Sequence, residues 1–135
     1  MNNKNIFNKI IKNEVFSYKV AENIDHLAFL DIHPMKIGHT LVIPKKINRD
    51  KIFSLSEKDF VSIMSFSRKV AIGIEKTIPC NRVGIFVMGF EIPHIHIHLI
   101  PMDKESDGYF SKTRIILSTK KLKFLSYIIK KSINL

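Results

Sequence analysis

Hydrophobic and polar positions follow two distinct periods along the chain, and the shorter period is clearest near the middle of the second half. Between His94 and Leu99, histidine alternates with isoleucine or leucine. A period of two is typical of a strand, whose successive side chains point to opposite faces of a sheet. We therefore expect a strand from His94 to Ile100. Pro93 and Pro101 bracket it, because proline cannot donate to a sheet ladder.

The longer period follows Ser56. Apolar residues recur at steps of three and four from Phe60 to Ile78, just before Pro79, and this spacing predicts one long amphipathic helix. The run Ser56-Glu57-Lys58-Asp59 has the spacing of a capping motif, with acidic residues in the first turn. The helix should therefore begin directly after Ser56.

Weaker patterns predict the remaining elements. Prolines and turn residues separate short apolar runs, which is typical of strands joined by tight connections. Apolar residues spaced by four indicate a short helix near each end of the chain. The expected strands are 17–22, 26–31, 39–43 and 82–87, the expected helices are 4–12 and one from about Thr119, and the polar segment 103–111 is expected to be a mobile surface loop.

Together these elements predict an α+β fold. It has a five-stranded antiparallel sheet, one long central helix, and short N-terminal and C-terminal helices. Short connections favour a meander of strands with the helices on one face. A length of 135 residues suits one core. We expect a single domain over 1–135, with its core in 5–101 and a C-terminal loop and helix in 102–135.

Composition changes this picture little. The net charge of +10 is compatible with nucleic-acid binding, but the lysines are scattered, so we do not expect nucleic acid as the main partner. We expect no signal peptide, because the opening residues lack an apolar core, and no membrane span, because no apolar run is long enough, so a cytoplasmic protein is expected. The lone Cys80 excludes an intramolecular disulfide and a Cys-x-x-Cys metal motif.

Three histidines on one face of a strand leave three explanations open. They are surface residues of a half-buried strand, or ligands of one metal ion. The third explanation is anion chemistry, in which imidazoles supply a nucleophile, a proton and hydrogen-bond donors around one reacting group. The anion explanation requires a pocket, and the rest of the chain offers residues for one.

The triad and its surroundings carry a specific family resemblance. His94-Ile95-His96-Ile97-His98 is followed by Leu99-Ile100-Pro101, and Gly38-His39-Thr40-Leu41-Val42-Ile43-Pro44 lies upstream. This arrangement resembles the histidine triad (HIT) family of nucleotide hydrolases and transferases. Further matches fall, in family order, within 6–11, 17–20 and 27–32, so the resemblance spans most of residues 5–101.

The resemblance implies a role for each matched residue. His96 would be the nucleophile, and His98 would contact the α-phosphate and the leaving group. His94 would support the site and fix the tautomer of His96, while His39 would close the phosphate pocket and Asp31 would bind the ribose. The base cleft falls on Ile6, Phe7, Ile10, Phe29 and Ile32. No cofactor or metal is implied, because the zinc ligands of some relatives are missing here.

The implied function is that of a nucleotidyl hydrolase. It would cleave a nucleoside 5′-phosphoramidate or a related adenylated compound to the 5′-monophosphate through a nucleotidyl-histidine. Alternatives are a purine nucleotide-binding protein with little turnover and a dinucleoside polyphosphate hydrolase. The short loop before the triad departs from the family, since Phe90 and Glu91 replace its usual polar residues. A carboxylate there would repel phosphate unless it points away, pairs with a lysine or arginine, or meets a cationic substrate. The resemblance also implies a two-fold homodimer.

Overall fold

The computed structural model describes residues 6–135 and contains a five-stranded antiparallel sheet with three α-helices. The expected start of the first helix at Lys4, and residue 5 of the expected core, lie outside the described residues. The strands are β1 (Lys19–Glu22), β2 (His26–Leu30), β3 (Thr40–Pro44), β4 (Arg82–Phe86) and β5 (Ile97–Met102). The helices are α1 (Ile6–Ile11), α2 (Glu57–Thr77) and α3 (Thr119–Ser132), with short 3₁₀ turns η2 (Ile52–Ser54) and η3 (Glu105–Gly108).

Local signals place the two longer helices. The Ser56 side chain accepts a hydrogen bond from the backbone N–H of Asp59 at 3.1 Å, which satisfies one of the unpaired donors at the start of α2. Ser118 does the same for Lys121 at 3.1 Å, so α3 begins at the next residue. The predicted starts of both helices are confirmed.

The sheet order differs from the expected meander. Its strands lie in the order β1-β2-β3-β5-β4, all antiparallel, so β5 separates β3 from β4. Burial explains this order. Five of the six residues of β5 are buried, as a central strand requires, whereas no residue of β4 is fully buried. The chain therefore passes from β3 through α2 to the far edge of the sheet and returns through β5.

The bounds of the triad strand also differ from the prediction. Pairing of β5 begins at Ile97, because the N–H of Ile95 donates to Arg49 O at 2.7 Å instead of to a strand. At the other end, Pro101 lies inside the strand opposite Val83. Pairing with β3 has already ended at Leu99. A proline at 101 thus has a strand neighbour on one side only, where a missing N–H is tolerated.

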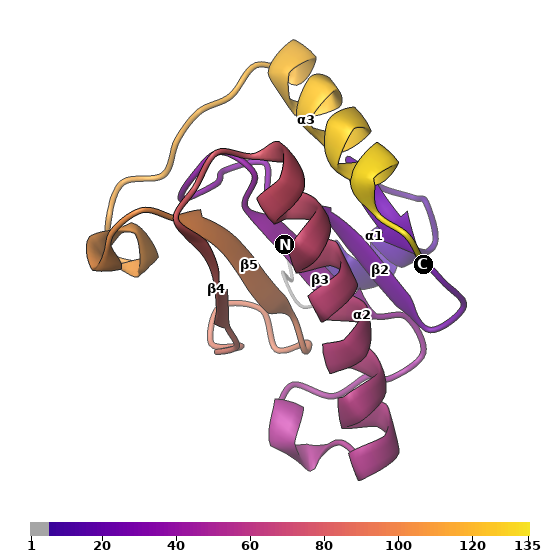
Figure 1. Cartoon of the computed structure of the whole chain (residues 1–135). Coiled ribbons are helices and arrows are strands. Elements are labelled where there is room, and N and C mark those ends of the chain that lie inside the picture. Colours follow the sequence, from indigo (N-terminus) through magenta and orange to yellow (C-terminus); the bar gives the residue numbers. More distant parts are fainter. Residues whose placement is uncertain (1–5) are drawn as a thin grey trace.

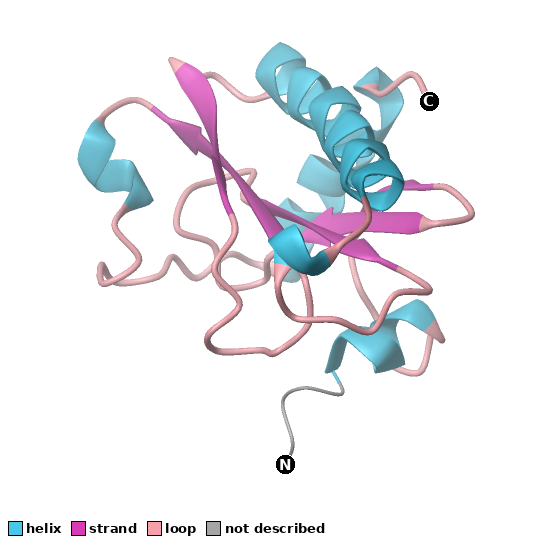
Figure 2. Ribbon diagram, turned by 90° about the horizontal axis from the view of Figure 1, so that it is seen from below, coloured by secondary structure: helices cyan, strands magenta, loops and turns pink. Residues whose placement is uncertain are grey.

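The helices cover both faces of the sheet. In Figure 1, α2 and α3 lie side by side on one face, and they enclose the larger core cluster. Figure 2 shows the short N-terminal helix on the opposite side of the sheet from α2. The expectation that all helices share one face is therefore wrong for α1, whose Phe7 and Ile10 form a smaller buried cluster with Leu27, Phe29, Leu41 and Ile43.

The segment after β5 is more structured than a simple surface loop. It contains η3, and the Asp107 side chain accepts hydrogen bonds from the N–H groups of Asp103 at 2.9 Å and Lys104 at 3.2 Å. Lys36 and Lys112 also approach this carboxylate.

Within residues 6–135, no helix is both long and apolar enough to cross a membrane.

Candidate active site

The three triad histidines lie on the sheet face that carries α1. The ring centroid of Phe7 is 5.5 Å from that of His94 and 5.1 Å from that of His96. The rings of His96 and His98 are 4.9 Å apart. All three histidines are at most 7% exposed, whereas residues that lie on the surface by chance would be largely exposed. The explanation by three surface histidines is therefore wrong.

Long-range pairing brings the fourth histidine to the triad. In β5, His98 lies opposite Leu41 of β3, two residues after His39. Gly38 precedes His39 with φ of +95°, a conformation that favours glycine, and a Cβ there would approach Ile78 Cγ1 to 3.0 Å. The tight turn at Gly38 therefore leads the chain into β3 with the His39 ring buried beside His98.

Hydrogen bonds assign the protons on His39 and His98. The backbone N–H of Met35 donates to His39 Nδ1 at 3.0 Å, so this nitrogen is an acceptor. In a neutral imidazole the proton is then on Nε2. That N–H lies 3.0 Å from His98 Nδ1 and donates to it. The proton of His98 is consequently on Nε2, which leaves this group as a hydrogen-bond donor for a bound anion.

The same reasoning gives His96 the opposite tautomer. Its Nδ1 lies 2.7 Å from the carbonyl oxygen of His94, and a carbonyl can only accept. The proton of His96 is therefore on Nδ1, and Nε2 carries a free lone pair. The site thus combines one nitrogen able to attack an electrophile with a neighbouring N–H able to stabilise negative charge.

Burial keeps these imidazoles neutral. It lowers the pKa of His39 to about 2 and the pKa of His98 to about 3. The positive charge of Arg114 adds to the effect of burial in each case. Burial also lowers the pKa of His94 and His96. For His96 the carbonyl of His94 and the carboxylates of Asp31 and Glu91 act in the opposite direction. Neutrality at pH 7 is what the assigned tautomers and a nucleophilic imidazole require.

Asp31 lies at the same site, directly after β2. Its Oδ2 is 3.8 Å from His39 Nε2, and its Oδ1 accepts from the backbone N–H of His33 at 2.9 Å. Burial raises the pKa of this carboxyl group, and the His33 N–H and the charge of Arg114 oppose that rise. An acidic side chain is therefore held within reach of the histidine cluster.

The expected base-cleft residues separate into two groups. Phe7, Ile10 and Phe29 are at most 7% exposed and belong to the smaller core cluster, with Ile6 packed against it. The rings of Phe7 and Phe29 are 6.0 Å apart. Ile32, in contrast, is 52% exposed. The first group forms an apolar wall beside the triad, and Ile32 presents an uncovered apolar surface next to Asp31.

The loop before the triad carries the two unusual residues on its surface. Phe90 is 94% exposed, and Glu91 is also exposed. Along the described part of the chain, no ion pair within 4.0 Å involves Glu91. Its charge nevertheless raises the pKa of His96. Glu91 therefore faces solvent close enough to the triad to influence it.

A metal ion fits this site less well than an anion. One donor atom each from Asp31, His39 and His98 lie within 4.8 Å of one another, a spacing that could surround an ion. Two of these donors, however, already share the hydrogen bond between His39 and His98. The guanidinium of Arg114 also lies 3.4 Å from the carboxylate, and a bound cation would meet its positive charge.

Phe110 and Arg114 also contact the site, although the sequence patterns did not predict this. The ring of Phe110 meets that of His98 edge-on at 4.9 Å, and Arg114 pairs with Asp31. Both residues come from an irregular segment without periodicity. The one available signal was composition, because Arg114 is one of only four arginines in a lysine-rich chain, and arginine suits fixed, partly buried ion pairs.

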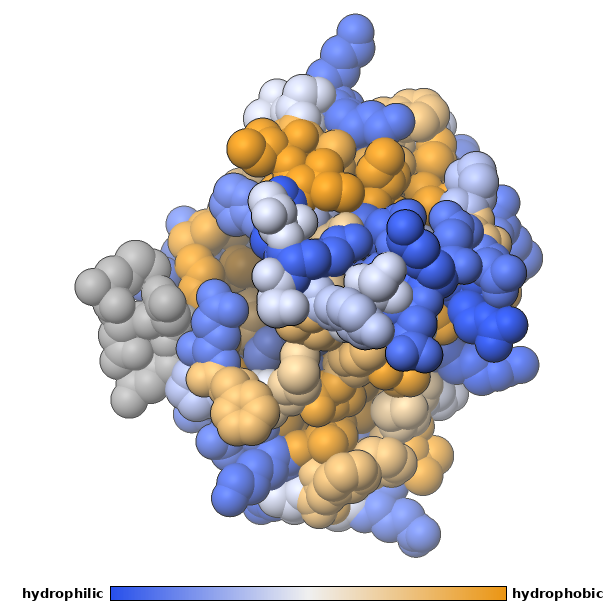
Figure 3. All heavy atoms as spheres, turned by 90° about the vertical axis from the view of Figure 1, so that its left-hand side faces the viewer, coloured by the Kyte–Doolittle hydropathy of each residue, from blue (hydrophilic) through white to orange (hydrophobic). Residues whose placement is uncertain are grey.

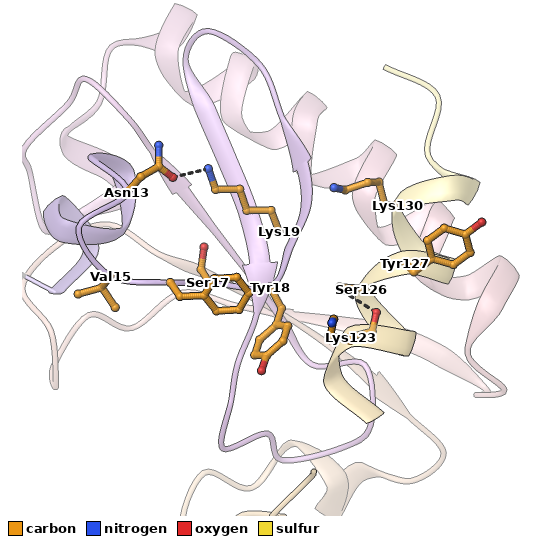
Figure 4. A pocket seen from close by; sticks show the side chains of 10 residues that line it. Asn13, Val15, Ser17, Tyr18, Lys19, Lys123, Ser126, Tyr127 and Lys130 are labelled. Carbon is orange, nitrogen blue, oxygen red and sulfur yellow. Dashed lines mark hydrogen bonds between the residues drawn. The ribbon is translucent and has the colours of Figure 1, made fainter. Parts of the chain in front are cut away.

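A separate groove lies away from the triad, between β1 and α3. Figure 4 shows Lys19 on the β1 side and Lys123, Tyr127 and Lys130 on the α3 side. None of the histidines lines it. The groove therefore belongs to the helix side of the molecule and takes no part in the candidate active site.

A buried His-x-His-x-His run on one face of an antiparallel sheet, joined by a fourth buried histidine, is the arrangement of a histidine-triad protein. The family profile of the HIT domain matches residues 12–105. The chain belongs to the HIT family.

Individual relatives agree with this assignment. The chain is 35% identical over 130 residues to an uncharacterized HIT-like protein of Borreliella burgdorferi, covering 90% of this chain and 92% of the other. It is 39% identical over 105 residues to an adenosine 5′-monophosphoramidase of Schizosaccharomyces pombe, covering 76% and 77%.

A solved structure shares the fold closely. The Hit-like protein involved in cell-cycle regulation from Bartonella henselae superposes with a TM-score of 0.81 at 28% identity, over 95% of each chain. The predicted α+β, HIT-like fold class is therefore confirmed.

Proposed function

We propose that this protein is a nucleotidyl hydrolase that cleaves a nucleoside 5′-phosphoramidate to the 5′-monophosphate. The observation that carries the proposal is the complementary protonation of two neighbouring imidazoles. His96 has a lone pair on Nε2, and His98 has a proton on its Nε2. Relatives that are named adenosine 5′-monophosphoramidase, at 39% and 32% identity, support the choice of substrate class.

The reaction would proceed by two displacements at phosphorus. In the first, Nε2 of His96 forms a bond to the α-phosphorus while the bond from phosphorus to the amine breaks, and the departing amine takes up a proton from solvent. The imidazolium that results on His96 is favoured by the carbonyl of His94 and by the charges of Asp31 and Glu91. In the second, water attacks phosphorus and loses a proton to solvent, the bond to His96 breaks with its electron pair returning to Nε2, and the monophosphate is released.

The other site residues would bind and orient the nucleotide. The N–H of His98 would donate to the phosphate, and His39 would hold His98 in the tautomer that allows this donation. Asp31 would accept from the ribose hydroxyls, since an ionised carboxylate is an acceptor only. The apolar wall formed by Ile6, Phe7, Ile10 and Phe29, together with the exposed Ile32, would contact the purine base.

A turnover assay with two matched variants tests this function. Wild-type protein in EDTA should release AMP from adenosine 5′-phosphoramidate, because the proposed chemistry uses no metal. His96→Ala should reduce turnover at least about a thousandfold, as expected for loss of a nucleophile. The control His26→Ala also removes a buried imidazole, but one that packs against Phe66 on the helix side.

The assay has clear adverse results. Equal turnover by wild-type protein and His96→Ala would exclude the proposed nucleophile. Saturable AMP binding in a calorimeter without any product would instead favour a nucleotide-binding protein with little turnover. Loss of activity only after EDTA treatment would restore the metal explanation.

We also propose that the protein forms a homodimer through the open edge at β4. This strand has a neighbour on one side only, and its Ile85 is 47% exposed. On the side of the molecule that carries β4, apolar side chains gather on both sides of a polar band (Figure 3). An open strand edge favours pairing with a second copy. Light scattering should give twice the chain mass for the wild type and a monomer for Ile85→Lys, and a wild-type monomer would refute the proposal.

The cytoplasm remains the expected compartment, to be checked by fractionation.

A further inference from the structure

The chain beyond the triad returns to the active site and is fixed there at two points. The Phe110 ring packs edge-on against His98 at 4.9 Å and against Phe86 at 5.4 Å. Five residues later, the N–H of Ile115 donates to Pro34 O at 2.8 Å. The intervening residues are thereby held across the end of the site at which Asp31 lies.

Three contacts define the position of Arg114 in this segment. Its Nη1 donates to the carbonyl oxygen of His33 at 2.8 Å and lies 3.4 Å from Asp31 Oδ2. The guanidinium carbon is 5.8 Å from the centre of the Phe110 ring. A side chain held by a carbonyl, a carboxylate and an aromatic face has few alternative positions.

The contact with Asp31 leaves that carboxylate able to bind a ligand. A separation of 3.4 Å is longer than the about 2.7–2.9 Å of a tight charged hydrogen bond. The side chain of Asp31 is 17% exposed, and that of Arg114 is 32% exposed. Oδ2 therefore faces a positive charge without being fully occupied by it.

The charge of Arg114 matters because Asp31 is in an unfavourable environment for an anion. The groups that act on it are the N–H and the imidazole of His33, the neutral rings of His39 and His96, and the guanidinium of Arg114. Burial raises the pKa of Asp31, and Arg114 lowers it. Without Arg114, the carboxyl group would hold a proton to higher pH and would lose acceptor capacity.

We propose that Arg114 is a positioning residue for ribose recognition, which holds the Asp31 carboxylate aimed at the vicinal hydroxyls of the nucleotide. This inference rests on the proposed function and deepens it. It assigns part of the substrate discrimination between ribose and deoxyribose to a residue supplied by the segment after the triad.

Paired substrates and variants test the proposal. Michaelis constants are measured with adenosine 5′-phosphoramidate and with its 2′,3′-dideoxy analogue, for the wild type, Arg114→Gln and Arg114→Lys. Arg114→Gln should raise KM for the ribose substrate about tenfold, the size expected for weakening one charged hydrogen-bonding group. It should change KM for the dideoxy substrate less than about twofold, because that substrate lacks the hydroxyls, and Arg114→Lys should restore part of the loss.

Two further readouts separate positioning from a structural role. The control Lys112→Gln removes a nearby cation that pairs with Asp107 at 3.7 Å and should leave both KM values unchanged. In Arg114→Gln, the pKa of Asp31 rises further, so the weakening of ribose binding should begin at a higher pH than in the wild type. A loss of equal size with both substrates, or no loss with either, would overturn the proposal.

The outcome can be distinguished from failure of the proposed function. Calorimetry with AMP and with 2′,3′-dideoxy-AMP measures the same discrimination without turnover. If the wild type binds AMP but releases no product, hydrolysis fails while the role of Arg114 is still decided by the two ligands. If the wild type prefers neither ligand, the assigned role of Asp31 fails, and that of Arg114 fails with it.

Discussion

The two faces of the sheet are made by the same strands but bury different chemistry. On the face covered by α2 and α3, aliphatic side chains such as Ile74, Ile97 and Leu99 are at most 1% exposed. On the face beside α1, the imidazoles of His39, His96 and His98 are buried almost as completely. Apolar burial stabilises a fold by about 25 cal/mol for each Å² removed from water. Burying an imidazole instead disfavours its protonated form.

The difference indicates how the site is maintained. The helix side provides the stability that allows the triad side to hold its histidines neutral, with their tautomers set by fixed hydrogen bonds. Five histidines are buried in total, of which only His26 packs on the helix side against Phe66. Acid should therefore lower the free energy of unfolding mainly through the histidines of the triad side. A substitution that leaves a cavity on the helix side should lower it equally at every pH.

The largest effect expected is a loss of stability in acid. The folded-state pKa values of the buried histidines are lowered, and the unfolded values are about 6.5. Below that pH the unfolded chain binds protons that the folded chain does not, so the free energy of unfolding falls. Each histidine contributes at most about 1.4 kcal/mol per pH unit. Urea unfolding at pH 7.5, 6.5 and 5.5 should show a plateau above pH 6.5 and a steep fall below it.

A variant on the other face supplies the matched control. Ile74→Ala removes a fully buried side chain of α2 and should lower the free energy of unfolding by about 2–5 kcal/mol. That loss should be the same at pH 7.5 and at pH 5.5, because no titrating group is removed. Stability of the wild type that does not change between these pH values would contradict the neutral triad.

A smaller effect is expected at the rim of the triad side. The charge of Glu91 raises the pKa of His96, so Glu91→Gln should lower that pKa. The acid limb of kcat/KM should move to lower pH, since His96 must be neutral to attack. KM should also fall, because a negative charge near the phosphate is removed. Glu75→Gln on α2 serves as the control, and identical pH profiles for the two variants would refute this role of Glu91.

Local patterns predicted most of the fold. The helices α2 and α3 were predictable because their caps and apolar stripes lie within a few residues of one another. The position of β5 between β3 and β4 was not, because strand order depends on contacts between distant segments. The prediction that the strand ends before Pro101 was wrong for the same reason. A proline is tolerated inside β5 because pairing with β3 has ended there and only β4 is a neighbour.

The candidate site likewise has features that the sequence predicts and features that depend on the folded structure. The alternating histidines and the His39 block identified the triad through a family resemblance. Their protonation could not be predicted, because it depends on the N–H of Met35 and the carbonyl of His94. Arg114 was missed because it lies 83 positions from Asp31 in an aperiodic segment. Its role becomes visible only after folding brings the two charges together.

The stereochemical course at phosphorus tests the central claim most directly. An adenosine 5′-phosphoramidate made chiral at phosphorus with oxygen isotopes is hydrolysed in isotopically labelled water, and the configuration of the AMP is determined. Two displacements, the first by His96, predict retention of configuration. Inversion would show that water attacks phosphorus directly, and it would contradict a nucleotidyl-histidine intermediate.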